Sequence, residues 1–353
     1  MKIKNQVSLL VALLFLGGCG GSSESGNNDE EVQKVKQINE SDVAEKYITP
    51  VDEYWIGGPQ FDYADLGEEV IFSHFIATSL VKVNDSGYFE HVRSHEDMSS
   101  TFVAKLNDNL VALHAGTDIK FYNYDNDVFD LAYNANVKIG SNPHLQTIGN
   151  CVYWISREDY GTAVSKACEN AGSFSQDVVF VTSGYVFKLQ ATAEGQLLIL
   201  EGIEGENYLR LFSTDGALLD EYAYELPIYG HSVEQIGNSF FVTGTTTLYT
   251  FSVRNSSLSD IQVLQVFEPQ TGMNGSNALT THGNNLIYTV DDYIYYYQMS
   301  SNGQVNQVYK AQVSYVVSSM FVKNDTLIVN YVGSFDSTPS IGMETFQLAE
   351  LLN

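Results

Sequence analysis

The stretch Gly283-Asn284-Asn285-Leu286-Ile287-Tyr288 decides the fold, because the chain carries seven copies of its pattern. A turn-forming pair rich in Gly, Asn and Asp is followed by one variable residue and then by a run of apolar residues. Gly and Asn favour tight turns between antiparallel strands, and the apolar run is typical of a strand buried on both faces. The other six copies are 67–72, 107–112, 149–154, 194–199, 237–242 and 324–329.

The copies are evenly spaced along the chain. Their first apolar residues are 70, 110, 152, 197, 240, 286 and 327, so the spacings are 40, 42, 45, 43, 46 and 41 residues. Each copy is followed by an alternating segment and another turn, so each repeat predicts four short strands, A to D. A β-sandwich has no reason to repeat one turn at near-constant spacing. We therefore predict an all-β, seven-bladed β-propeller of four-stranded antiparallel blades.

The seventh repeat indicates how the ring closes. Its strand C falls at about Glu344–Leu348, and only five residues follow it, too few for a strand D. The segment 47–56 precedes the first strand A and belongs to no complete blade, yet it has apolar side chains to bury. We expect part of this segment to supply strand D of the last blade, antiparallel to Glu344–Leu348, because an unpaired edge there would be an aggregation hazard.

The N-terminus has the pattern of an export signal. Lys2 and Lys4 precede a mostly apolar run over residues 7–16, followed by small residues. The run is too short to span a bilayer as a helix, which takes about 20 apolar residues. We predict that residues 1–18 are a signal peptide.

Leu16-Gly17-Gly18-Cys19 resembles the lipobox of bacterial lipoproteins. The resemblance implies cleavage before Cys19 and attachment of lipid to its thiol; the alternative is an ordinary signal peptide that happens to contain a cysteine. In that family an Asp after the cysteine favours the inner membrane, and here that residue is Gly20. The resemblance therefore implies a lipid anchor in the outer membrane, on its periplasmic face or at the cell surface.

The residues after Cys19 predict a flexible tether. Residues 20–42 are mostly Gly, Ser, Asn, Asp and Glu with few large apolar side chains, so burial cannot offset the entropy lost on ordering. Such a segment reaches roughly 25–30 Å. The predicted organisation is a signal peptide over 1–18, a lipidated tether over 19–42 and the propeller over 43–353.

The charge of the chain restricts its partners. Without the two lysines of the signal peptide, 15 basic residues face 43 acidic ones, a net charge of −28. A field of that sign repels phosphate backbones, which excludes nucleic acid, and it opposes docking on anionic lipid headgroups. We expect membrane attachment to come from the lipid alone. The acidic residues are dispersed, which favours a solvated surface over a dedicated basic or divalent-cation partner.

The two remaining cysteines predict a disulfide. Cys151 opens strand B of the third repeat and Cys168 ends its strand C. With the turn around 158–161, antiparallel pairing places the two opposite each other, and an exported protein meets an oxidising compartment. A thiolate metal site is the alternative, but no matching His or Cys cluster accompanies them.

A search for reaction chemistry finds none. The sequence has no Ser nucleophile elbow, phosphate loop, dinucleotide fingerprint or two-His metal helix, and its seven His are scattered. We predict no cofactor and no metal. Three small polar loops enter strands A, and equivalent positions of a propeller converge on its axis. They supply the channel-mouth candidates Asn142, His144, His231 and Asn277, although such residues also simply serve turn geometry.

The chain resembles bacterial outer-membrane lipoproteins that carry a β-propeller domain, and the propeller likeness covers about residues 47–353. In its architecture and its expected location it is similar to the propeller lipoprotein of the outer-membrane barrel assembly machinery. Its repeat motif departs from that protein's, so no functional residue is carried over. There is no Trp-Asp signature and no sialidase Asp-box, and only Trp55 and Trp154 occur, against the Trp-docking pattern of quinoprotein repeats.

Two functions follow from these features. The first is a non-catalytic interaction or scaffold module for another envelope protein, which the absence of catalytic motifs favours. The second is the binding or processing of a small molecule or glycan at the mouth of the central channel. Converging carboxylates, His or stacked aromatics at the mouth would favour the second function, and small featureless side chains the first. The sequence predicts no oligomeric state.

Overall fold

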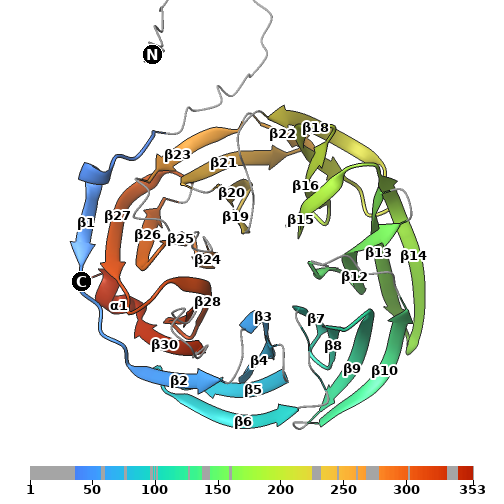
Figure 1. Cartoon of the computed structure of the whole chain (residues 1–353), viewed down its shortest axis with the longest axis horizontal. Helices are drawn as coiled ribbons and strands as arrows, with labels where there is room; N and C mark the ends of the chain where they lie inside the picture. Colours follow the sequence, from blue (N-terminus) through green and yellow to red (C-terminus); the bar gives the residue numbers. More distant parts are fainter. Residues whose placement is uncertain are drawn as a thin grey trace, which may run out of the picture. The chain divides into compact units, whose positions relative to one another are not determined.

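The computed structural model describes residues 36–56, 60–74, 78–95, 98, 100, 102–125, 128–136, 144–158, 161–224, 232–244, 246–259, 261–267, 278–300, 303–331 and 341–352. Within these residues, seven small sheets form a ring around a central axis (Figure 1). The predicted seven-bladed β-propeller is confirmed. None of the helices in this part of the chain is long and apolar enough to cross a membrane.

We number the blades along the chain. Blade 1 consists of β3 (Gln60–Asp65), β4 (Glu69–His74), β5 (Thr78–Val83) and β6 (Phe89–His95). Blade 2 consists of β7 (Phe102–Asn107), β8 (Leu110–Ala115), β9 (Asp118–Asp125) and β10 (Val128–Asn136). Blade 3 consists of β11 (Gln146–Ile148), β12 (Cys151–Glu158), β13 (Gly161–Asn170) and β14 (Ser173–Thr182). Blade 4 consists of β15 (Tyr185–Ala191), β16 (Leu197–Ile203), β17 (Glu206–Phe212) and β18 (Leu218–Tyr224).

The last three blades follow the same order, from strand A near the axis to strand D at the rim. Blade 5 consists of β19 (Val233–Ile236), β20 (Ser239–Thr243), β21 (Thr247–Arg254) and β23 (Gln262–Val266), with the short β22 (Ser257–Leu258) also on β21. Blade 6 consists of β24 (Leu279–His282), β25 (Asn285–Val290), β26 (Tyr293–Met299) and β27 (Val305–Gln312). Blade 7 consists of β28 (Val317–Lys323), β29 (Thr326–Tyr331), β30 (Ile341–Gln347) and β2 (Asp52–Ile56).

The turns between strands A and B explain the repeated sequence pattern. Gly149, Gly237 and Gly283 open three of them with φ of 58°, 58° and 59°, a left-handed conformation that glycine adopts without strain. No atom lies within 4 Å of where a Cβ would stand, so the backbone conformation, and not a lack of space, favours glycine here. In blade 7 the same turn uses Asn324 and Asp325, with φ of 49° and 57°.

Seven apolar layers, one between each pair of neighbouring blades, hold the ring together. Strand B is buried on both faces, as its unbroken apolar run predicts: Val70–Phe72 and Leu286–Tyr288 are fully enclosed. In the layer that joins the first blade to the last, Phe72 packs with Phe321 and Met343. Full burial of one such side chain stabilises the fold by about 1.5–3 kcal/mol.

The N-terminal strand closes the last blade, as the sequence predicts. β2 runs antiparallel to β30, with Asp52 opposite Thr345 and Ile56 opposite Ile341. The predicted strand C, 344–348, is shifted: β30 begins three residues earlier, at Ile341, and it ends one residue earlier, because Leu348 begins a short helix, α1 (Leu348–Leu352). β2 therefore pairs with residues 341–345 and reaches only the first two residues of the predicted strand. Leu348 and Leu351 are buried, so the helix covers the end of the apolar layer between blades 6 and 7.

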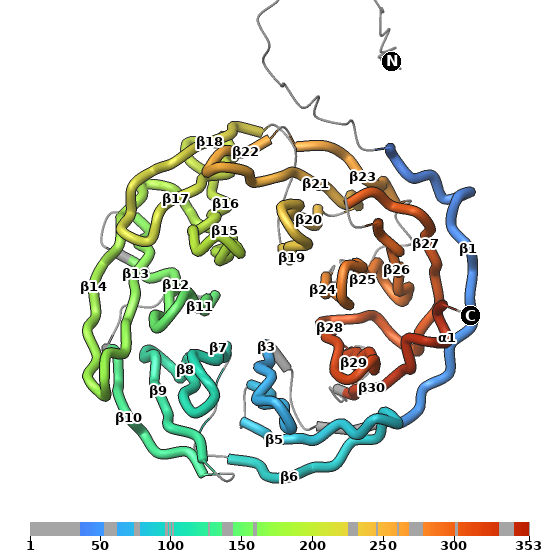
Figure 2. Tube along the Cα trace, turned by 180° about the vertical axis from the view of Figure 1, so that it is seen from behind, coloured from blue at the N-terminus to red at the C-terminus, as the bar shows by residue number. Residues whose placement is uncertain are grey.

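A second N-terminal strand was not predicted. β1 (Val43–Lys46) runs parallel to β27 and becomes the outermost, fifth strand of blade 6. Ahead of it, Ile38 is buried and forms a parallel bridge to Gln265 of blade 5, so packing begins before the boundary expected at residue 43. A 3-10 turn over Glu40–Asp42 joins the two contacts. Figure 2 shows this segment, 36–56, as a belt along the rim of the ring.

Cys151 and Cys168 form the expected disulfide. They lie directly opposite each other on β12 and β13, in the register that the turn at Glu158 and Gly161 sets. Reduction should lower the free energy of unfolding by about 3 kcal/mol in the chain-entropy model. Urea unfolding with and without reductant measures the difference. The double variant Cys151→Ala/Cys168→Ala is the control and should not respond to reductant; an equal response in both proteins would contradict the prediction.

Candidate functional site

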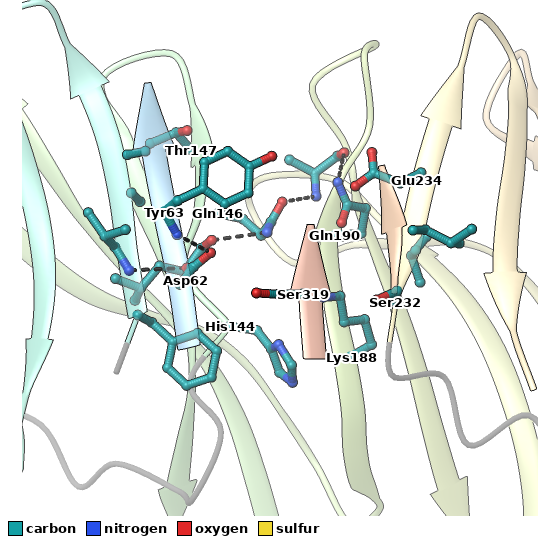
Figure 3. A pocket seen from close by; sticks show the side chains of 18 of the residues that line it. Asp62, Tyr63, His144, Gln146, Thr147, Lys188, Gln190, Ser232, Glu234 and Ser319 are labelled. Carbon is teal, nitrogen blue, oxygen red and sulfur yellow. Dashed lines mark hydrogen bonds between the residues drawn. The ribbon is translucent and has the colours of Figure 1, made fainter. Parts of the chain in front are cut away.

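The strands A of all seven blades line a central cavity of about 520 Å³. The lining combines apolar side chains, charged side chains and small polar ones such as Thr147, Ser232, Ser318 and Ser319. Four acidic or basic lining groups have no ion pair within the described part of the chain, namely Asp62, His144, Lys188 and Glu234, and they come from blades 1, 3, 4 and 5 (Figure 3). The other two charged lining residues, Asp65 and Lys105, form ion pairs with Lys323 and Asp108.

β-Bulges help to bring these groups together. The pairing of strand A with strand B shifts register just before Asp62, Lys188 and Ser319. These three residues pair with Ser73, Leu200 and Asn330, each the fourth position of the apolar run in its blade. They therefore lie at one level of the channel. A bulge re-aims side chains in this way at the rims of barrels and beside active sites.

Asp62 is fixed by the backbone of two blades. One carboxylate oxygen accepts a hydrogen bond from the amide of Tyr63 at 3.0 Å, and the other accepts one from the amide of Val103 in blade 2 at 3.1 Å. The side chain lines the cavity and is partly exposed there. Burial raises the pKa of Asp62 to about 6, against the lowering effect of the two amides and of Lys188.

Lys188 is the unusual group of the site. Its aliphatic chain reaches into the cavity (Figure 3), and its ammonium has no hydrogen bond or close ion pair to any residue that the structure describes. Burial lowers the pKa of Lys188, while the charges of Asp62 and Glu234 act in the opposite direction. A deeply placed ammonium without a direct partner is costly in free energy, so it requires an explanation.

Glu234 lies at a different level of the channel. It pairs with Phe241, the second position of the apolar run in blade 5, so it stands two positions away from the level of Lys188. Its carboxylate also lacks a direct partner among the described residues. Burial raises the pKa of Glu234 to about 7, and the charge of Lys188 opposes this rise. The phenol of Tyr63 lies near enough for Glu234 to raise its pKa further, after burial.

His144 is a neutral member of the site. Its backbone φ is 46°, an uncommon conformation for a residue with a side chain, and its ring packs at 5.5 Å from that of Phe102. Burial and then the charge of Lys188 lower the pKa of His144 to about 3, although a backbone hydrogen bond at Phe187 opposes this. The buried Nε2 atom has no partner in the described part of the chain.

Of the four residues predicted at the channel mouth, the structure places one. His144 lines the cavity, whereas Asn142, His231 and Asn277 lie outside the described residues, as does Cys19. Their convergence therefore stays a prediction. Asp62, Lys188 and Glu234 were missed. For Lys188 and Glu234 the available signal was a single charge within an otherwise apolar or neutral strand A, as in Val186-Phe187-Lys188-Leu189, whereas the strand of Asp62 also carries Asp65.

The described residues contain no group of three or more His, Cys, Asp or Glu side chains placed to hold a metal ion. The channel groups instead suit direct binding of a polar molecule, since an unpaired ammonium and an unpaired carboxylate face the same cavity. Titrating groups with shifted pKa values that face a cavity are the usual signature of a candidate functional site.

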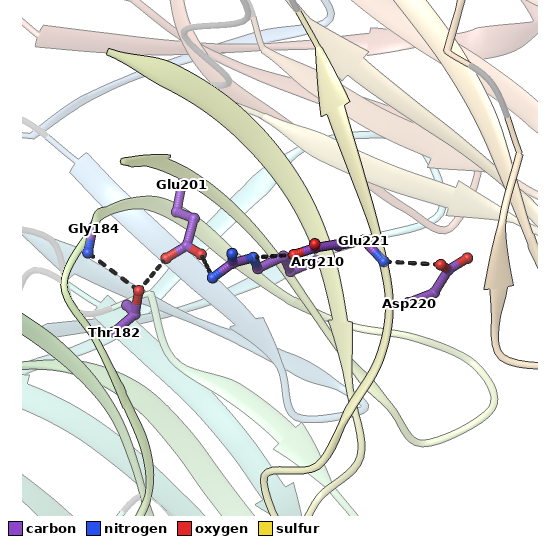
Figure 4. A network of polar contacts seen from close by, with 6 residues as sticks. All are labelled: Thr182, Gly184, Glu201, Arg210, Asp220 and Glu221. Carbon is purple, nitrogen blue, oxygen red and sulfur yellow. Dashed lines mark hydrogen bonds and ion pairs between the residues drawn. The ribbon is translucent and has the colours of Figure 1, made fainter. Parts of the chain in front are cut away.

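Another buried charge lies outside the channel. In blade 4, the fully enclosed Glu201 accepts hydrogen bonds from Arg210 at 2.6 Å and from Thr182 at 2.8 Å, and Arg210 also contacts Glu221 at 3.1 Å (Figure 4). Each oxygen of Glu201 has a partner. This network joins the end of β14 to blade 4 and is structural, unlike the incomplete set of contacts in the channel.

The raised pKa of Glu234 predicts the effect of Glu234→Gln on stability. The unfolded carboxyl ionises near pH 4.5 and the folded one near pH 7, so its contribution to stability is present below pH 4.5 and is lost as the pH rises through 7. Glu234→Gln should therefore melt at about the same temperature as the wild type at pH 4.5 and a few degrees higher at pH 8. Differential scanning calorimetry at both pH values measures this.

The difference in melting temperature between the wild type and Glu234→Gln isolates the effect of Glu234 from that of neighbouring titrating groups. As the pH rises, the contribution of Asp62 to stability should also fall, between about pH 4 and 6, whereas that of His144 should rise between about pH 3 and 6.5. Both changes occur in the wild type and in the variant, so they cancel in the comparison. A variant that melts lower than the wild type at pH 8 would show that the ionised Glu234 is paired and stabilising.

No family model and no curated protein matches the sequence. Solved structures match the fold. The chain is similar to PorZ, a bacterial surface component of the type-IX secretion system of Porphyromonas gingivalis, at 11% identity and a TM-score of 0.55, over 85% of this chain and 38% of the PorZ chain. It is similar to virginiamycin B lyase from Staphylococcus aureus at 12% identity and a TM-score of 0.57, over 83% of this chain and 98% of the lyase.

A putative 6-phosphogluconolactonase from Bacteroides fragilis matches at 11% identity with a TM-score of 0.56, over 80% of this chain and 92% of that chain. Identities this low show the fold alone. The protein is a β-propeller, a class whose members here include a secretion component and two proteins named as enzymes, so its function has to be argued from its own site.

Proposed function

We propose that this protein is a lipid-anchored envelope β-propeller that binds a small polar molecule in its central channel. The observation that carries the proposal is the ammonium of Lys188, which faces a cavity of about 520 Å³ without a direct partner among the described residues. The cavity is within the size range of small-molecule sites. Charged groups that converge there favour ligand binding over a featureless scaffold.

A thermal-shift panel of amino acids, short peptides, sugars, organic acids and polyamines tests this proposal. At least one class should raise the melting temperature of the wild type, because a ligand at 100 times its Kd stabilises by about 2.7 kcal/mol. Ser232→Trp, which fills the channel, should abolish the shift. Leu218→Trp, on the exposed rim of blade 4, is the matched control and should retain it. Equal shifts in all three proteins would place the binding outside the channel.

The proposed localisation at the outer membrane rests on the N-terminal motif. If Cys19 receives lipid, Cys19→Ser should leave an unprocessed precursor that takes up no labelled fatty acid and is no longer recovered with outer membranes. Metabolic labelling and membrane fractionation measure both effects. Cys151→Ala/Cys168→Ala, which leaves Cys19 intact, is the control. Unchanged processing and labelling of Cys19→Ser would contradict the anchor.

A second candidate function is an interaction module for another envelope protein. Four apolar side chains are exposed on the outer strands β14 and β18, namely Val178, Val181, Leu218 and Leu219. The two strands belong to neighbouring blades, and the turn at Gly216 approaches the carbonyl of Val179 so closely that a Cβ would clash with it. Photo-crosslinkers at Val178 and Leu218 should capture one defined envelope protein if this rim is an interface, and nothing discrete if it is not.

A further inference from the structure

We infer that the channel ligand is a small amino compound that also carries a carboxylate, with its two charged groups several ångströms apart. This inference rests on the proposed function and names the chemical class that the same site takes. Short peptides and amino acids with a distal amine belong to this class.

The charges left unsatisfied in the channel define the two ends of the ligand. Asp62 already accepts one backbone amide on each oxygen, so it is partly satisfied within the protein. The ammonium of Lys188 and the carboxylate of Glu234 have no direct partner in the described residues. A ligand carboxylate at Lys188 and a ligand ammonium at Glu234 would supply the two missing partners. Such charge-assisted hydrogen bonds are stronger than those between neutral groups.

The positions of these two residues set the spacing of the ligand charges. Lys188 and Glu234 belong to adjacent blades and stand at levels two positions apart in their pairing with strand B. Two positions of a strand span roughly 6–7 Å of backbone along the channel, and the distance between the two blades adds to this separation. A ligand that contacts both groups directly should therefore have separated charges, unlike the simplest α-amino acids, whose two charges are adjacent.

Ligands with one kind of charge fit this site poorly. A simple anion would satisfy Lys188 but would meet Asp62, Glu234 and the field of a chain with a formal charge of −26. A simple amine would satisfy Glu234 but would leave Lys188 without a counter-ion in the cavity. Neutral sugars would leave both charges without a counter-ion. Small polar side chains such as Gln190 and Ser319 remain available to the middle of a dipolar ligand.

Titration calorimetry with a matched set of probes tests the class. The dipolar probes are 5-aminopentanoate and alanyl-alanine; pentanoate, pentylamine and pentanamide each lack one or both charges. The wild type should bind at least one dipolar probe about tenfold or more tighter than any of the other three, since each charge-assisted contact is worth at least that factor.

Two variants assign the ends of the ligand. In Lys188→Met the dipolar probe should lose its advantage over pentylamine, and in Glu234→Gln it should lose its advantage over pentanoate. Lys120→Met and Glu206→Gln, which remove the same charges outside the cavity, should bind as the wild type does. Melting temperatures and circular dichroism spectra show that each variant is folded.

The outcomes separate this inference from the proposed function. If no dipolar probe binds better than its single-charge analogues, the zwitterion class is wrong. If at the same time a sugar or another compound from the thermal-shift panel binds the wild type but not Ser232→Trp, the channel remains a ligand site of a different class. If nothing in the panel or in the probe set distinguishes the wild type from Ser232→Trp, both proposals fail.

Discussion

A chain that starts at Gly57 should lose its cooperative unfolding transition or melt more than about 10 °C below a chain that starts at Lys36. The shorter chain lacks β2, which forms five residue pairs with β30 and thereby joins the two ends of the ring. It also lacks the contact of the Asp52 carboxylate with the amide of Phe89 at 2.9 Å. At about 1 kcal/mol for each hydrogen bond, the loss is comparable to the whole stability of many domains.

An intermediate truncation separates ring closure from the rim belt. A chain that starts at Asp52 keeps β2 but loses β1, the buried Ile38 and the ion pair of Glu40 with Lys310 at 2.7 Å. Because Glu40 is half-exposed and Lys310 is partly exposed, this ion pair contributes little, and the chain should melt only a few degrees below the longest one. Thermal melts of all three chains give the comparison. Equal melting temperatures for the chains that start at Lys36 and Gly57 would refute the closure.

Arg210→Ala should destabilise the fold by about 3–5 kcal/mol, because it leaves the carboxylate of Glu201 buried without its counter-ion. Glu201 is fully enclosed, and Arg210 donates to it at 2.6 Å. The melting temperature should fall by roughly 6–20 °C at 2–4 °C for each kcal/mol. Urea unfolding measures the change in free energy.

Two further variants test the cause of this loss. Glu221→Gln removes only the half-exposed partner of Arg210 and should cost about 1 kcal/mol or less. The double variant Glu201→Met/Arg210→Met replaces both members of the buried pair by apolar groups and should recover most of the stability lost in Arg210→Ala. A double variant as unstable as Arg210→Ala would show that packing of the arginine chain, and not the unpaired charge, matters.

The fold was accessible from sequence because its signals are local. Each Gly-Asn turn and the apolar run after it occupy about six consecutive residues, and the left-handed φ of Gly149 and Gly283 gives the pattern a physical cause. Ring closure followed from counting strands. The belt could not be predicted, since β1 is only four residues long. The ion pair that fixes the turn before β1 joins Glu40 to Lys310, 270 positions away along the chain.

The channel groups were harder to predict for a specific reason. Asp62 and Lys188 each follow a register shift in the pairing of strand A with strand B. A one-residue shift moves a side chain to the other face of the sheet, so alternation along the sequence assigns these residues incorrectly. His144 was found because it precedes its strand, where position in the loop and not alternation decides the direction.

Native mass spectrometry of the protein after incubation with the small-molecule fraction of a periplasmic extract tests the central claim most directly, since the candidate ligand does not have to be chosen beforehand. The wild type and Leu218→Trp should each gain one discrete mass, whereas Lys188→Met/Glu234→Gln and Ser232→Trp should gain none. The same added mass on all four proteins, or none on the wild type at saturating extract, would contradict the account that the channel binds a ligand.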